Sequence, residues 1–331
     1  MPMRVSISLL LMLSLLALFT GSVSLTPVQV WQSLCGGGDE AVRYIVFESR
    51  MPQMFTAILA GAALAVSGLV MQTLFANPLA DPSLLGVNSG ASLGAAIALL
   101  ACGGSVVVGG AALSGVVLTI AASFVGACAV ILLLSVCSHY LRGTLALLVA
   151  GVMLSFGISA VISLLNFYAT ADGVRSYVVW GMGDFSGLTM QRIPLLAALV
   201  AVPSLMLLAA ARPLNALLLG ADYATNLGIR VKRVRTILLL LTGLLTAAVT
   251  ALCGPISFIG LAVPHIVRLL MHTADHRRLL PATLVMGANV ALLSLLLTHL
   301  PDERGTLPLS AITPFIGVPV VVYILLRRRS G

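Results

Sequence analysis

The chain has 331 residues, of which 60% are apolar and only 8% are charged. A soluble domain carries roughly 25% charged residues, so this composition excludes an ordinary water-soluble fold. The net charge of +8 does not indicate a nucleic-acid-binding protein, because the basic residues lie in short gaps between apolar runs instead of forming one water-facing surface. The composition therefore predicts an integral membrane protein.

Apolar runs recur along the whole chain, separated by charged or Pro- and Gly-rich gaps. A run of about 20 apolar residues crosses the hydrocarbon core of a bilayer as one helix. The pattern predicts an all-α polytopic membrane protein of about ten transmembrane helices, folded as one domain over residues 1–331. The expected spans are 5–25, 54–74, 84–102, 107–137, 145–168, 193–211, 236–252, 255–271, 282–298 and 309–326.

The distribution of basic residues orients the predicted bundle. Thirteen of the eighteen Lys and Arg residues fall on the cytoplasmic side if the first span is uncleaved and starts in the cytoplasm. Residues 5–20 are also compatible with a cleaved signal peptide, but an uncleaved span gives every later loop a consistent side. We expect an inner-membrane protein with both termini in the cytoplasm. The cytoplasmic segments would be 138–144, 212–235 and 272–281, and the outer ones 26–50, 169–192 and 299–308.

Small residues recur at helical spacing in two of the predicted spans, at Gly61, Ala65 and Gly68 and at Gly90 and Gly94. Small residues let helix backbones approach closely where lipid provides no hydrophobic drive for association. The second group also matches the G-x-S-x-G motif of hydrolases, but that motif requires a strand-to-helix turn. We therefore interpret both groups as helix contacts and disfavour a membrane-embedded hydrolase.

Nucleotide, metal and ion chemistry have few candidate residues here. Lys232 is the only lysine and follows no glycine, so a phosphate-binding loop is excluded and the chain is not itself an ATPase. The five cysteines are scattered, with no C-x-x-C spacing for a metal. No carboxylate stands at the centre of a span, which disfavours an ion-coupled transporter.

Two polar features near the predicted spans have two possible roles each. Asp81, in a proline-broken stretch, either lines a pathway or forms a turn. His265 and Arg268 share a helix face, as a functional pair or as an ordinary polar helix end.

A series of short motifs runs through the chain in order. They are Arg50-Met-Pro52, Gly61 to Gly68, Gln72 to Ala80, Leu85 to Ala91, Trp180 to Gly187, Leu214 to Gly220, Gly254 to Arg268 and Gly317-Val-Pro319. The series covers essentially the whole chain and resembles the FecCD family of ABC importer permeases, which carry iron-siderophores, haem and cobalamin.

The resemblance implies the function and the partners. A homodimer would enclose a central pathway, two cytoplasmic ATPase subunits would use ATP and Mg, and a substrate-binding protein would dock outside. The chain itself would bind no cofactor and would import a metal chelate into the cytoplasm by alternating access. The alternative from another class is an ion-coupled secondary transporter.

The cytoplasmic segment 212–235 is the expected ATPase-coupling loop, since the resemblance places coupling helices before the seventh span. Its residues 214–228 put apolar side chains near one helical face, and Gly220 and Gly228 suit breaks between two short helices. No Lys or Arg lies between 213 and 229, which disfavours a helix lying flat on the membrane and favours a partner protein. The expected coupling residues are Leu217, Leu218, Gly220, Ala221, Asp222, Thr225 and Gly228.

Two further groups follow from the resemblance. Arg50 and Arg304 are expected to be exposed cations at the outer rim that dock the binding protein, or simply to reach the lipid headgroups. The chain departs from the family pattern beside both, with Gln53 where a second arginine is common and Thr306 where a glutamate is common. A gate is expected at Arg142, Gly143 and Thr144, although an ordinary loop also fits, and the pathway is expected to include Asn77, Asp81 and Asn88.

Overall fold

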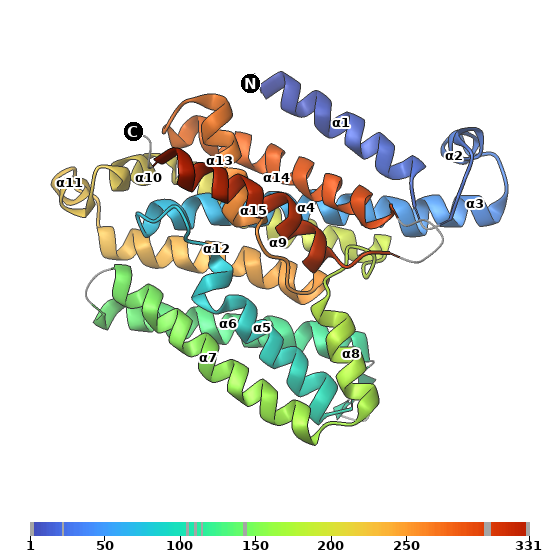
Figure 1. Ribbon diagram of the computed structural model, residues 1–331, viewed down its shortest axis with the longest axis horizontal. Coiled ribbons are helices and arrows are strands. Elements are labelled where there is room, and N and C mark those ends of the chain that lie inside the picture. Colours follow the sequence, from blue (N-terminus) through green and yellow to red (C-terminus); the bar gives the residue numbers. More distant parts are fainter. Residues whose placement is uncertain are drawn as a thin grey trace.

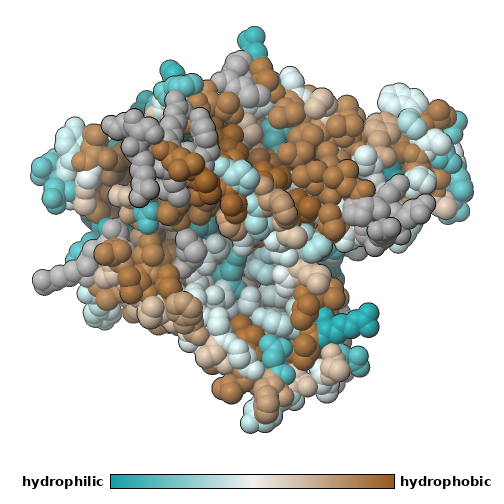
Figure 2. Space-filling view, in the orientation of Figure 1, coloured by the Kyte–Doolittle hydropathy of each residue, from teal (hydrophilic) through white to brown (hydrophobic). Residues whose placement is uncertain are grey.

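The computed structural model describes residues 3–328 except positions 22, 104–105, 109–110, 114, 142–143 and 301–305. The described part is a bundle of helices that run roughly side by side (Figure 1), plus one short antiparallel pair, β1 (Val106–Val108) and β2 (Ala111–Leu113). The all-α fold class is confirmed in this sense. Apolar side chains cover much of the surface seen in Figure 2, as expected for a protein in lipid.

Within the described residues, six helices are long and apolar enough to cross a membrane. They are α4 (Met51–Leu74, continuous with α3, Glu40–Tyr44, and η1, Ile45–Arg50), α6 (Gly115–Tyr140), α7 (Thr144–Tyr168), α9 (Ile193–Ala209), α12 (Val231–Cys253) and α14 (His276–Thr298). Each overlaps a predicted span. Four shorter apolar helices occupy the other predicted positions: α1 (Met3–Phe19), α5 (Val87–Ala96, extended by η3, Ile97–Ala101), α13 (Ile259–Met271) and α15 (Leu309–Arg328). A total of ten spans stays a prediction.

Helix α4 forms the centre of the bundle and packs against α14, α12, α13 and α9. Its crossings depend on glycine. A Cβ added to Gly61 would stand 2.2 Å from the carbonyl oxygen of Gly287 in α14, and one added to Gly287 would stand 2.3 Å from that of Gly61. The same reciprocal contact joins Gly90 of α5 to Gly126 of α6. The prediction that these small residues are helix contacts is confirmed.

Two non-helical stretches interrupt the helices of the bundle. The first runs from Phe75 to Gly86 and contains the short η2 helix (Pro82–Leu85); the second, residues 254–258, separates α12 from α13. Asp81 of the first stretch lies against Gly260, at the start of α13. Irregular backbone at membrane depth is tolerated where protein buries it, and Asp81 is only 7% exposed.

The remaining short helices gather at the two ends of the bundle. Helices α10 (Ala211–Leu218) and α11 (Ala221–Asn226) lie at one end, on the left of Figure 1. Helices α2 (Pro27–Leu34), α3 and α8 (Ala171–Gly181), followed by η4 (Met190–Arg192), lie at the other. We refer to these as the α10 end and the α8 end.

Candidate functional site

The expected coupling loop forms two short helices at the α10 end. Gly220, with φ of +108°, separates α10 from α11, and Gly228, with φ of +82°, follows α11. Both conformations are costly for residues with a Cβ, so the predicted glycine breaks are confirmed.

The predicted single apolar face is only partly correct, because the break at Gly220 turns the two helices differently. Leu214 is fully buried in the core, and Leu217 is half-buried. We call the exposed part of α10 and α11, residues 218–228, the tip. Its outward-facing apolar side chains are Leu218 (45% exposed), Leu219 (66%), Tyr223 (49%) and Leu227 (59%). Ala221, Asp222, Thr225 and Gly228 are exposed beside them. The tip is thus an apolar surface outside any span, suited to cover by a partner protein.

Two predicted pathway residues, Asn77 and Asp81, lie in the broken stretch after α4, and a third, Asn88, lies just beyond it in α5. The side chain of Asn77 accepts a hydrogen bond from the backbone N–H of Leu79 at 2.9 Å, and Asp81 accepts one from Ser83 at 2.8 Å. Both are turn contacts. Asn88 differs, because its side-chain oxygen accepts a hydrogen bond from Thr250 of α12 at 2.9 Å. These contacts hold the break in shape; a pathway role for the three residues stays a prediction.

The polar end of α13 is tied to the same break. His265 Nε2 lies 2.8 Å from the carbonyl oxygen of Pro78, and Arg268 donates to the side-chain oxygen of Gln72 at 2.5 Å. Gln72 also donates to the carbonyl of Leu261 at 3.1 Å. The two residues share a face, as expected, but His265 joins α13 to the break after α4, whereas Arg268 joins it to the last turn of α4 itself.

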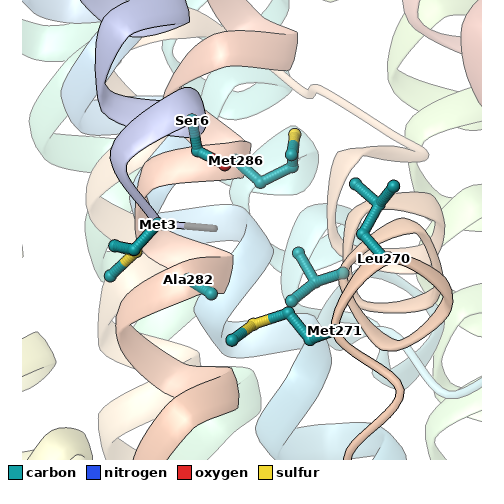
Figure 3. A pocket seen from close by; sticks show the side chains of 7 residues that line it. Met3, Ser6, Leu270, Met271, Ala282 and Met286 are labelled. Carbon is teal, nitrogen blue, oxygen red and sulfur yellow. The ribbon is translucent and has the colours of Figure 1, made fainter. Parts of the chain in front are cut away.

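A small cavity between α1, α13 and α14 carries no site. Figure 3 shows methionine side chains around it, from Met3, Met271 and Met286, together with Ser6. Its volume is about 10 Å³, which is at the lower limit for a single water molecule.

The α8 end contains two larger cavities. One, of about 490 Å³, lies between α8, the end of α14 and the start of α15; the other, of about 620 Å³, lies between α8, α6 and the end of α12. Val179 and Asp184 line both. The backbone N–H of Asp184 donates to the carbonyl of Cys253 at 2.8 Å, and that of Ser310 donates to Met182 at 3.0 Å. The segment after α8 is therefore anchored to α12 and α15 between two hollows.

Arg50 is not the exposed rim cation that we expected. It is only 3% exposed, and its guanidinium donates to the carbonyl oxygens of Leu18 at 2.7 Å and Val23 at 2.6 Å. The chain after α1 folds back over η1, so the arginine is enclosed by backbone acceptors instead of facing water. Arg304, Arg142 and Gly143 lie outside the described residues, and for Thr144 only its place as the first residue of α7 is described.

Sequence reasoning missed one polar cluster. Asn215 of α10 contacts Asp275 and His276 at the start of α14, and His276 contacts Thr73 of α4. These residues are up to 203 positions apart, so no local pattern signals them.

Comparison with known proteins decides the family. A model described as the FecCD transport family matches residues 9–327. The chain belongs to this family.

Named relatives and a solved structure agree with this FecCD assignment. The chain is 35% identical over 324 residues to the vitamin B12 import system permease protein BtuC of Klebsiella pneumoniae, covering 98% of this chain and 93% of that protein. It is 36% identical over 326 residues to the BtuC of Escherichia coli O9:H4, covering 98% and 97%. A structure described as the inward-facing conformation of a metal-chelate type ABC transporter aligns with a TM-score of 0.86 at 28% identity, covering 98% of each chain. The chain is thus a membrane-embedded transport component of the ABC importer class.

Proposed function

We propose that this chain is the permease subunit of an ABC importer that moves cobalamin across the inner membrane into the cytoplasm. The observation that carries the proposal is the 35–36% identity, over 98% of the chain, to permeases of vitamin B12 import systems. Related chelates, haem and iron-siderophores, are the competing substrates. ATP is hydrolysed on separate subunits that carry the nucleotide and Mg, and both chain termini are cytoplasmic.

The exposed tip of α10 and α11 is the surface that contacts the ATPase. Its support is the apolar group Leu218, Leu219, Tyr223 and Leu227, which no other described element covers. Gly220→Pro would impose φ near −65° where the chain has +108°, and Ala221→Arg would place a charge beside the apolar tip. Both variants are expected to insert into the membrane and yet to uncouple hydrolysis from transport.

A second copy of the chain encloses the transport pathway together with the first, and the dimer transports its substrate by alternating access. Helices α7 and α15 support this, because each exposes large apolar side chains, including Phe156 (65%) and Phe315 (82%). Figure 2 also shows a hollow of near-neutral hydropathy between the part formed by α13 and α15 and the part formed by α5 and α8. We expect Thr144→Cys to cross-link between the two copies in the inward-closed state if the turn before α7 is the gate. A binding protein is expected to dock at the α8 end.

Proteoliposomes containing the permease, its ATPase and its binding protein test the function. Uptake of cyanocobalamin, haemin and ferrichrome is compared with ATP inside and with no ion gradient. ATP-dependent uptake of cyanocobalamin above the other two supports the proposal. Uptake that needs an ion gradient but no ATP would instead establish the secondary transporter.

A further inference from the structure

Helix α10 is attached to the membrane bundle in a way that α11 is not. The side chain of Leu214 is fully buried in the main core, and α10 packs against α14, α4 and α9. Among the described residues, helix α11 makes its main contacts with α10 and α12. A displacement of the tip therefore enters the bundle mainly through α10.

Asn215, next to Leu214, makes polar contacts with the start of α14. Its side-chain nitrogen donates to Asp275 Oδ1 at 2.6 Å, and its oxygen accepts from the backbone N–H of His276 at 2.8 Å and lies 2.8 Å from His276 Nδ1. A carboxylate only accepts and a backbone N–H only donates, so a single orientation of the amide satisfies all three contacts. Asn215 thus holds both the capping residue and the first residue of α14.

His276 carries the connection onward to α4. Its side chain is 1% exposed, and its Nε2 lies 2.8 Å from the hydroxyl of Thr73, which is 4% exposed. Because the oxygen of Asn215 is an acceptor, His276 Nδ1 bears the proton that faces it. In the neutral imidazole, Nε2 is then an acceptor that faces the Thr73 hydroxyl, whose single proton is shared between this contact and the carbonyl oxygen of Leu69, 3.0 Å away in its own helix. One continuous polar chain therefore runs from α10 through α14 to the last turns of α4.

We propose that Asn215 is a positioning residue that makes α10, α14 and α4 move together when the tip is displaced. The inference rests on the proposed contact between the tip and the ATPase, and goes beyond it by naming the connection through which that motion reaches the bundle. Without the amide, α10 would keep its apolar contact through Leu214 but would be free to shift against the start of α14. ATP hydrolysis would then continue while less of its motion reaches the transmembrane helices.

The test measures ATP hydrolysis and chelate uptake in the same proteoliposomes, with the chelate that the wild-type complex transports. Asn215→Ala is expected to keep the ATPase bound and hydrolysis within about twofold of wild type, while uptake per ATP falls roughly tenfold, as expected when a buried polar contact is lost. Asn166→Ala is the matched control, since among the described residues the bond of that amide stays within its own helix, to Ile162 at 3.1 Å. The control should retain the wild-type ratio.

Two further variants separate positioning from simple loss of folding. Thr73→Val keeps nearly the same shape and should lower the same ratio; combined with Asn215→Ala it should add little, because both act in one chain of contacts. The exchange Asn215→Asp with Asp275→Asn restores a donor and acceptor pair and should recover coupling, whereas Asn215→Asp alone places two carboxylates together and should not.

The outcomes distinguish this inference from the proposed function. If wild-type protein transports and Ala221→Arg uncouples it, but Asn215→Ala keeps the wild-type ratio, the positioning role is wrong and the ATPase contact stands. Fully additive effects of Asn215→Ala and Thr73→Val would also overturn it. If the wild-type complex shows no ATP-dependent uptake, the proposed function fails, and this inference fails with it.

Discussion

The carboxylate of Asp81 lies against the bare Cα of Gly260, so closely that a Cβ added there would stand 2.5 Å from Asp81 Oδ2. The added Cβ would also stand 2.9 Å from the backbone oxygen of Leu64 in α4. Gly260 in turn fills the space where a side chain on Gly68 of α4 would lie. The first helix break and the central helix α4 thus converge on one residue of α13 that has no side chain.

Gly260→Ala should therefore destabilise the protein by about 1–3 kcal/mol, the usual cost of overpacking a core. Gly157→Ala is the control, since no described atom outside its own stretch of helix lies within 4 Å of its added Cβ and alanine favours a helix. Thermal unfolding in detergent measures both. Equal melting temperatures for the two variants would mean that the contact between Asp81 and Gly260 is looser than described.

Arg50→Met should lower the free energy of unfolding by about 1.5–3 kcal/mol, because it removes charge-assisted hydrogen bonds to the carbonyls of Leu18 and Val23. Arg43→Met, at the same end of the bundle but exposed, should change it little. Denaturation of the purified variants decides this. If Arg50→Met instead leaves stability intact and slows association with the binding protein, the rim role that we first expected would be restored.

The proposed orientation predicts opposite labelling of two positions. Single cysteines replace Tyr140, which is 82% exposed at the α10 end, and Thr189, which is exposed after α8, in a background without the five native cysteines. An impermeant thiol reagent applied to intact cells should label position 189 only. Labelling of position 140 from outside would reverse the topology.

The Asp275 carboxyl should make the thermal stability of the protein depend on pH. The hydrogen bonds from Asn215 and from the backbone of Arg277 lower the pKa of the Asp275 carboxyl below its ordinary value of 3.8. A carboxyl with a lowered pKa in the folded state stabilises fully above that ordinary value, and the contribution is lost as the pH falls through the lowered pKa. The difference in melting temperature between wild type and Asp275→Asn should therefore be constant near neutral pH and shrink below about pH 4. A difference that grows on acidification would contradict this assignment.

Local sequence patterns, hydropathy and the placement of glycines, predicted much of the fold. The six long helices overlap predicted spans, the glycines of α4 and α5 are helix contacts as expected, and Gly220 and Gly228 flank α11. These features succeed because each depends on local composition or on the conformational needs of a single residue. The expected exposure of Arg50 failed because the sequence does not say which backbone acceptors fold over a side chain.

The sequence by itself determined that this chain is built for lipid, where its helices lie, where they break, and to which family it belongs. Only the tertiary structure decided which polar groups meet: Asn215 with His276, 61 positions away, His276 with Thr73, 203 positions away, and Asp81 with Gly260. The physical reason is that the hydropathy of a segment is the sum of contributions from residues that are consecutive in the sequence, so the sequence alone gives it. A hydrogen bond needs two atoms within about 3 Å, and the packing of distant helices alone sets that distance.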